Sequence, residues 1–196
     1  MKSWKIVIGA AALAVLATPV AAQELGMGTN GDQFVEAVQK RDGDKATQLL
    51  ADHPTIVDSR DGKGNTALII AISRSDPDYT GFLLNKRADP NLPGAGGDTP
   101  LIAAAKAGFD DAAGWLIDLG AKVDTANRKG ETPLIIAVQQ RDTNLVKLLL
   151  EHGANPDRTD AVAGYSARDY ATRDNRARQI LQLIQSAKPK PAAAKP

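Results

Sequence analysis

Histidines and neighbouring carboxylates are the residues of this 196-residue chain that could support metal-binding or acid–base chemistry. The two histidines, His53 and His152, lie far apart in the sequence. The carboxylate pairs are Asp110 with Asp111 and Asp157 with Asp160. A metal or catalytic site needs several such groups that converge, and neither histidine has another ligand type clustered near it. We therefore predict no catalytic residue, no metal site and no cofactor, and expect His152 to be a helix-end residue that the helix dipole favours.

Other ligand classes find equally little support. The glycine-rich residues 94–97 lack the strand, helix and Lys-Ser/Thr context of a phosphate-binding loop. Basic residues do not alternate with aromatic ones, so nucleic-acid binding is not predicted. The chain has no cysteine, which excludes disulfides, cysteine-based zinc sites and lipid attachment at a cysteine.

A motif recurs along the chain at a fixed spacing, and the structural elements that it forms must hold any functional residues in place. Its clearest copy is residues 129–157, and two earlier copies stand in the same register. The repeated columns, whose members differ by 33 in residue number, are Gly64, Gly97 and Gly130; Thr66, Thr99 and Thr132; Ala71, Ala104 and Ala137; and the pairs Leu83–Leu84, Leu116–Ile117 and Leu149–Leu150. Weaker copies flank these three at a spacing of 34. The chain is therefore five units of one motif.

This pattern resembles the ankyrin repeat, which is carried here by GDTPLIAAA…WLIDLGA and GETPLIIAV…LLLEHGA. The resemblance spans about residues 32–187 and implies an all-α solenoid of helix-turn-helix repeats with hairpin-like loops. The expected repeats are about residues 32–60, 61–93, 94–126, 127–160 and 161–187, three full repeats between two caps. The family usually has His after Thr-Pro-Leu. Because Ile69, Ile102 and Ile135 stand there, we expect apolar packing instead.

Helix starts are predicted from side chains that can accept a hydrogen bond from an unpaired backbone amide. Thr66, Thr99 and Thr132 should cap the first helices of the central repeats. In the first unit Asp32 fills this column, which predicts a helix over residues 33–40. The second helices should be capped by Asp42, Asp76 and Asp142, with Asp110 displaced by one residue.

Both ends of the chain differ from the repeats. Residues 1–22 read as a secretory signal: Lys2 and Lys5 precede an apolar segment at residues 6–16, and Ala22 ends a small-residue cleavage site. An uncleaved anchor is the alternative. Residues 23–31 are expected to be a flexible leader, and residues 188–196 a disordered Lys, Pro and Ala tail that is either solvated or bound to anionic envelope polymers. The predicted location is periplasmic or secreted, with no membrane span after cleavage.

Similarity to ankyrin repeats implies that a partner is held on the concave side, by loop tips and by exposed positions seven and eight after the Thr. The matching residues are Gln39, Lys40, Lys63, Asn65, Ser73, Arg74, Asp98, Lys106, Ala107, Arg128, Lys129, Glu131, Gln139, Gln140, Tyr165, Arg173 and Asp174. Seven are basic and three are acidic, although the chain after residue 22 has 22 bases against 23 acids, a net charge of −1. This predicts a locally basic face for an acidic protein surface. The alternative is that these charges only keep the face soluble.

The most favoured function is a non-enzymatic protein–protein interaction module, a monomeric scaffold or adaptor in the periplasm. The alternative is an accessory or inhibitory subunit required for the activity of an exported enzyme.

Two environments are possible for the Trp115 side chain. Trp115 lies one position before the Leu116 column, so it belongs either to the core or to a hydrophobic patch at the seam between neighbouring repeats.

Overall fold

The computed structural model describes residues 28–187, within which ten α-helices form five helix-turn-helix units. The units are α1 (Asn30–Lys40) with α2 (Gly43–Asp52), α3 (Ala67–Ser73) with α4 (Pro77–Asn85), α5 (Pro100–Ala107) with α6 (Asp110–Asp118), α7 (Pro133–Gln140) with α8 (Thr143–Glu151), and α9 (Ala167–Arg173) with α10 (Arg178–Ser186). The predicted all-α solenoid is confirmed. The predicted signal segment, most of the leader and the tail lie outside the described residues.

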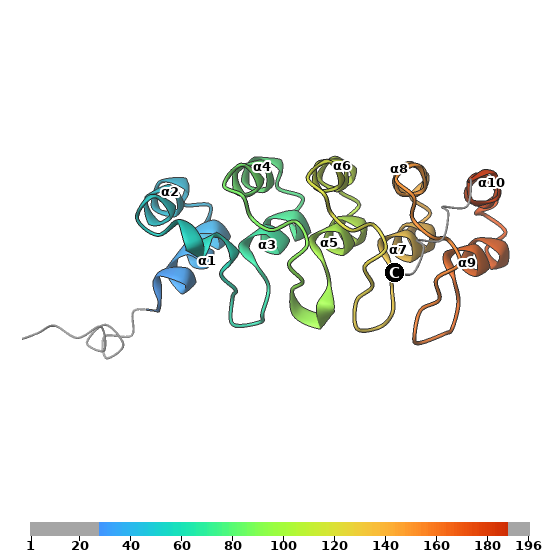
Figure 1. The fold of residues 1–196 in the computed structure, drawn as a ribbon, viewed down its shortest axis with the longest axis horizontal. Helices are drawn as coiled ribbons and strands as arrows, with labels where there is room; N and C mark the ends of the chain where they lie inside the picture. Colours follow the sequence, from blue (N-terminus) through green and yellow to red (C-terminus); the bar gives the residue numbers. More distant parts are fainter. Residues whose placement is uncertain (1–27, 188–196) are drawn as a thin grey trace, which may run out of the picture.

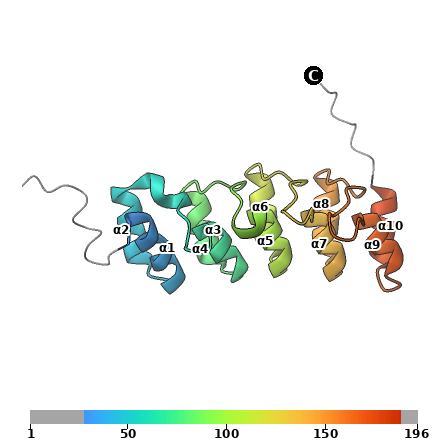
Figure 2. The same ribbon diagram turned by 90° about the horizontal axis from the view of Figure 1, so that it is seen from below.

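The units stack side by side in one direction, so the molecule has two rows of helices. An inner row holds α1, α3, α5, α7 and α9, and an outer row holds the second helix of each unit (Figure 1). Long loops project from the inner row, and each inner helix packs against the next one, as the view turned by 90° also shows (Figure 2). Two short 3₁₀ turns, η2 (Pro54–Asp58) and η3 (Ala95–Gly97), interrupt the connections.

Helix caps repeat with the sequence motif. The hydroxyls of Thr66, Thr99 and Thr132 accept hydrogen bonds from the backbone N–H three residues on, at 3.2–3.3 Å. Asp42, Asp76 and Asp142 cap the outer helices α2, α4 and α8 in the same way, as predicted. The units α3–α4 and α7–α8 therefore fix both of their helix starts with local hydrogen bonds.

Two predicted caps are wrong. Helix α1 begins at Asn30, earlier than expected, because Thr29 rather than Asp32 is its cap. Asp32 is the third residue of that helix, and its carboxylate accepts from the Thr29 amide in a capping box. Asp110 does not cap α6 either: the cap position is Phe109, whose side chain makes no cap bond, and Asp110 is the first helical residue.

The core consists of small and aliphatic side chains that lie between the two rows. Ala104, Ala105 and Ala137 are fully buried and let the inner helices approach closely, while Leu116 and Leu149 fill the space beneath the outer helices. Ile69, Ile102 and Ile135 are at most 4 % exposed, so the apolar packing predicted for this column is confirmed. A core of this kind explains how the chain folds with only 4 % aromatic residues.

Candidate partner-binding groove

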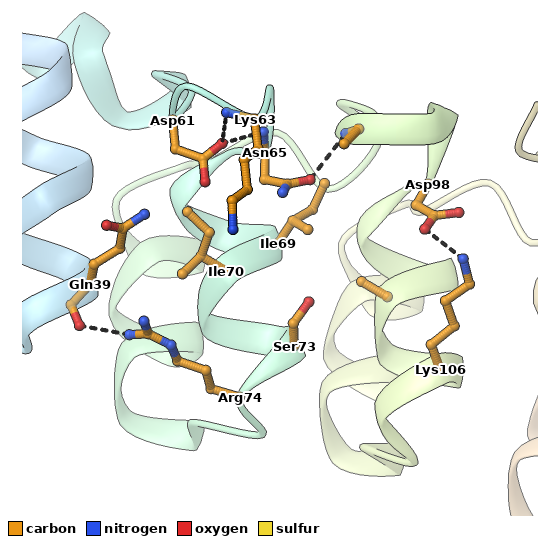
Figure 3. A pocket seen from close by; sticks show the side chains of 12 residues that line it. Gln39, Asp61, Lys63, Asn65, Ile69, Ile70, Ser73, Arg74, Asp98 and Lys106 are labelled. Carbon is orange, nitrogen blue, oxygen red and sulfur yellow. Dashed lines mark hydrogen bonds and ion pairs between the residues drawn. The ribbon is translucent and has the colours of Figure 1, made fainter.

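A groove of about 440 Å³ runs along the inner face of the first three units. Its apolar floor is formed by Ile69 and Ile70 of α3 and Ala103 of α5. Polar side chains from the inner helices and from two loops stand around this floor (Figure 3). They are Gln39, Asp61, Lys63, Asn65, Ser73, Arg74, Asp98 and Lys106. The unit that holds α3 supplies most of the lining, and the two neighbouring units complete the groove, with Gln39 on one side and Asp98, Ala103 and Lys106 on the other.

Hydrogen bonds across the seams hold the rim in place. The Arg74 guanidinium donates to the backbone carbonyl of Gln39 at 2.7 Å, which joins α3 to α1. The Asn65 amide oxygen accepts from the Ala95 N–H at 3.0 Å and joins the loop before α3 to the loop before α5. Because these contacts bridge neighbouring units, the rim moves only if the units themselves shift.

The groove brings together seven of the predicted partner-binding residues, which are Gln39, Lys63, Asn65, Ser73, Arg74, Asp98 and Lys106. The other predicted residues do not line it. They are Lys40 at the end of α1, Ala107 at the end of α5, Arg128, Lys129 and Glu131 in the loop before α7, Gln139 and Gln140 at the end of α7, Tyr165 before α9, Arg173 at the end of α9, and Asp174 directly after it. Of these, Gln140 donates to the Lys106 carbonyl at 3.1 Å, and Arg173 stacks on the Tyr165 ring at 3.9 Å.

Several of the predicted cations have acidic partners within the chain. Lys106 pairs with Asp98 at 2.6 Å, and Lys40 pairs with Glu36, which the count of seven bases against three acids left out. Around the groove itself, Lys63, Arg74 and Lys106 stand against Asp61 and Asp98, a balance of three minus two, or +1. The groove is therefore only mildly basic.

Sequence reasoning missed the residues that shape the loops. Asp61, Asn127 and Asp160 occupy one column, and each accepts hydrogen bonds from backbone N–H groups of its own loop. A second column links one unit to the next: Asp58, Asn91 and Asp124 each accept from the backbone N–H of the residue 31 positions later, Asp89, Lys122 and Asn155. The sequence did contain a signal, because Asp and Asn recur in these columns with the period of the motif. Their short polar side chains accept hydrogen bonds from nearby backbone N–H groups and therefore suit turns.

The two carboxylates of the pair Asp157 and Asp160 have separate structural roles. Asp160 is 5 % exposed and accepts from three backbone N–H groups and from the Tyr170 hydroxyl at 2.6 Å. Burial alone would raise the pKa of Asp160, but these donors outweigh burial and hold the pKa below its ordinary value. Asp157 instead forms a two-pronged ion pair with Arg168. The pair is therefore explained by the fold, as the sequence suggested.

Asp110 meets a carboxylate of the next unit rather than an arginine. Elsewhere, the arginine that ends an inner helix pairs with the aspartate at the next outer helix: Arg41 with Asp76 at 2.7 Å, and Arg141 with Asp174. In the intervening units that column holds Ser75 and Gly108, which carry no charge. Within the described residues, the Asp110 oxygen Oδ1 is buried without a hydrogen-bond partner. Burial, and then the charges of Asp142 and Asp111, raise the pKa of Asp110 from 3.8 to about 6.

Asp110→Asn should therefore make the protein more stable at neutral pH. The folded chain binds the Asp110 proton more tightly than the unfolded chain, so the stability of the native sequence falls as pH rises from about 4 to about 6 and is then constant. Removal of the charge should raise the free energy of unfolding above pH 7 by about 1 kcal/mol after allowance for solvent screening. Urea unfolding at about pH 3.5 and about pH 7.5, on either side of this window, measures the difference. Asp111→Asn, which removes the same charge from an exposed neighbour, should show a much smaller pH-dependent gain, and equal gains would rule out this explanation.

The histidines end outer helices: His53 follows α2 and His152 follows α8. Within residues 28–187, no three side chains of the metal-binding types gather closely enough to hold a metal ion. No helix in the same part of the chain is long and apolar enough to cross a membrane.

Comparison with known proteins agrees with this architecture. A family model described as ankyrin repeats, in three copies, matches the chain at residues 34–127, 91–160 and 122–191. The overlapping matches extend over all five helix pairs. No curated protein shows significant similarity to the chain. Ankyrin repeats are a protein–protein interaction module that is typically non-catalytic. The fixed spacing of the motif, the five stacked helix pairs and the family match lead to one conclusion: the chain belongs to the ankyrin repeat family.

Proposed function

We propose that the protein is an exported, non-enzymatic scaffold or adaptor that holds an acidic segment of a partner protein in the inner-face groove. The observation that carries this proposal is the groove itself, in which Lys63 and Arg74 stand beside an apolar floor of Ile69, Ile70 and Ala103. An extended segment can bury apolar side chains on such a floor and direct its carboxylates to the cations. This combination supplies both affinity and selectivity.

Lys63 and Arg74 are the cations best placed to meet the partner. Within residues 28–187, neither forms an ion pair with a carboxylate, whereas Lys106 is neutralised by Asp98. The Lys63 side chain reaches from its loop over the floor, and Arg74 is oriented by the Gln39 carbonyl (Figure 3). An oriented guanidinium loses little side-chain freedom when it binds a carboxylate. The proposal therefore assigns the charge recognition to these two residues.

The proposed location follows from residues 1–22 of the sequence. Lys2 and Lys5, the apolar residues 6–16 and the small residues before Gln23 together favour export through a secretory signal. Periplasmic or secreted partners are thus the ones to search for.

The test is capture of a partner from cell-envelope extract on the immobilised protein, followed by calorimetry with the purified partner. Lys63→Glu combined with Arg74→Glu should weaken binding by about tenfold or more, and high salt should weaken binding to the native chain. A matched control, Lys45→Glu combined with Lys147→Glu, makes the same charge change at exposed positions on the outer helices α2 and α8.

The control should bind the partner as the native chain does. If the two double variants lose the same affinity, or if neither loses any, the groove is not the binding site. A partner whose binding does not depend on salt would argue against charge recognition while leaving the interaction module intact.

A further inference from the structure

The outer face carries an apolar patch at the seam between α4 and α6, the second alternative that the sequence left open for Trp115. Three large apolar side chains are exposed within residues 28–187, and two of them, Trp115 at 37 % and Leu119 at 55 %, lie in this patch. Between the helices is a cavity of about 330 Å³, lined by Gly81, Leu84, Asn85, Trp115, Asp118 and Leu119. We call these six residues the outer patch. Adjacent exposed apolar side chains beside a cavity are typical of an interaction surface.

Leu119 is an exception within its own repeat column. The residues 33 positions before and after it are Lys86 and His152, both polar and both exposed at the ends of their outer helices. The fold therefore accepts a polar residue at this position. A leucine with 55 % of its surface in water gains little from packing within the chain.

Gly81 makes a second exception, because it stands inside α4 where glycine weakens a helix by about 1 kcal/mol relative to alanine. A Cβ atom built at Gly81 would meet no atom within 4 Å, so packing within the chain does not require glycine there. The next repeat also has glycine in this column, Gly114, and the one after it has Lys147. At Gly81 the missing side chain leaves the cavity open in front of Trp115 and Leu84.

The charges around the outer patch complement one another when the helices run in opposite directions. The first turns of α4 and α6 carry Asp78, which also lies 3.7 Å from Arg41 of the first unit, and Asp111. Three bases follow the last turns, Lys86 and Arg87 after α4 and Lys122 after α6, and they outnumber the one acid at that end of the patch, Asp118. These residues are exposed. A two-fold axis perpendicular to the helices would place the acidic ends of one copy against the basic ends of the other. Two-fold contacts use the same surface on both copies, so a self-complementary patch fits them.

From these observations we infer that the outer patch binds a second copy of the chain. Trp115 and Leu119 of each copy enter the cavity beside Gly81 of the other, and the acidic and basic helix ends pair across the contact. This inference replaces the monomer expected from the sequence. It goes beyond the proposed function, because the outer patch belongs to the outer row of helices (Figure 1), whereas inner helices and loops line the groove. A dimer formed here leaves both grooves open.

Sedimentation velocity of the purified full chain over a range of concentrations tests the inference. The native chain should form a dimer with a dissociation constant in the micromolar range, on the order of 1–100 μM for a small interface. Leu119→Glu should raise that constant by about tenfold or more, since it places a charge in the apolar contact. Val162→Glu is the matched control: Val162 is 78 % exposed in the loop before α9, far along the chain from the outer patch.

A second variant separates the contact from simple loss of folding. Gly81→Gln fills the cavity while it increases helix propensity, so it should weaken the dimer and leave thermal stability equal or higher. A dimer weakened by Leu119→Glu and Gly81→Gln but not by Val162→Glu supports the inference. A native chain that stays monomeric up to about 100 μM overturns it, and so does a dimer that both Leu119→Glu and Gly81→Gln leave intact. Capture of a different protein by the outer patch of a monomeric chain would also overturn self-association.

Discussion

Gly130→Ala should lower the free energy of unfolding by about 3 kcal/mol, because it combines backbone strain with a clash between two loops. Gly130 adopts a φ of 76°, a left-handed conformation that costs an alanine roughly 1 kcal/mol. A Cβ atom there would lie 2.5 Å from the backbone nitrogen of Ala161 and 3.1 Å from two backbone atoms of Asp160. That nitrogen donates to the Lys129 carbonyl at 2.8 Å. The two loops would have to separate and lose this hydrogen bond.

Gly64→Ala is the control for the backbone strain alone. Gly64 has the same place in its repeat and a φ of 89°, but a Cβ atom there meets no atom within 4 Å. This variant should lose only about 1 kcal/mol. Urea unfolding followed by circular dichroism measures both losses. Equal losses in the two variants would show that the loops before α7 and α9 do not depend on this close approach.

Leu116→Ala should cost 2–5 kcal/mol, roughly the range for a leucine removed from a packed core. Leu116 is a fully buried residue of α6, in the middle unit, and it packs within the cluster that joins all five units. Because a repeat protein is stabilised by contacts between nearest neighbours, a cavity in the middle unit weakens the connection between both halves. Thermal and urea unfolding would report the loss.

Leu119→Ala provides the comparison for the same substitution at the end of the same helix. Leu119 is 55 % exposed, so in the monomer this change should alter the free energy of unfolding by less than about 0.5 kcal/mol. Both variants should be measured at a concentration where the chain is monomeric, which keeps self-association out of the comparison. If Leu119→Ala were as destabilising as Leu116→Ala, the outer patch would be part of the core and not a surface for another copy.

The sequence by itself determined the fold, because the interactions that define each unit are local and recur at a fixed spacing. Thr66, Thr99 and Thr132 cap their helices through hydrogen bonds three residues away, and the alanine and leucine columns face the neighbouring unit in every repeat. A periodic sequence therefore specifies its elements, their order and their packing partners at once. Of the two caps that were predicted wrongly, Asp32 lies three residues from the true cap Thr29 and Asp110 lies one residue from the true cap position Phe109, and local patterns do not separate such close candidates well.

Only the tertiary structure decided which side chains of different units meet. The sequence identified Lys63 and Arg74 as candidates, but the stacking of three units placed them around one groove. Stacking also brought Asp110 to Asp142 of the next unit and opened the cavity between Gly81 and Trp115. Such contacts depend on the rise and rotation from one unit to the next. Those two quantities result from the summed packing of whole interfaces, so the spacing of residues along the chain does not contain them.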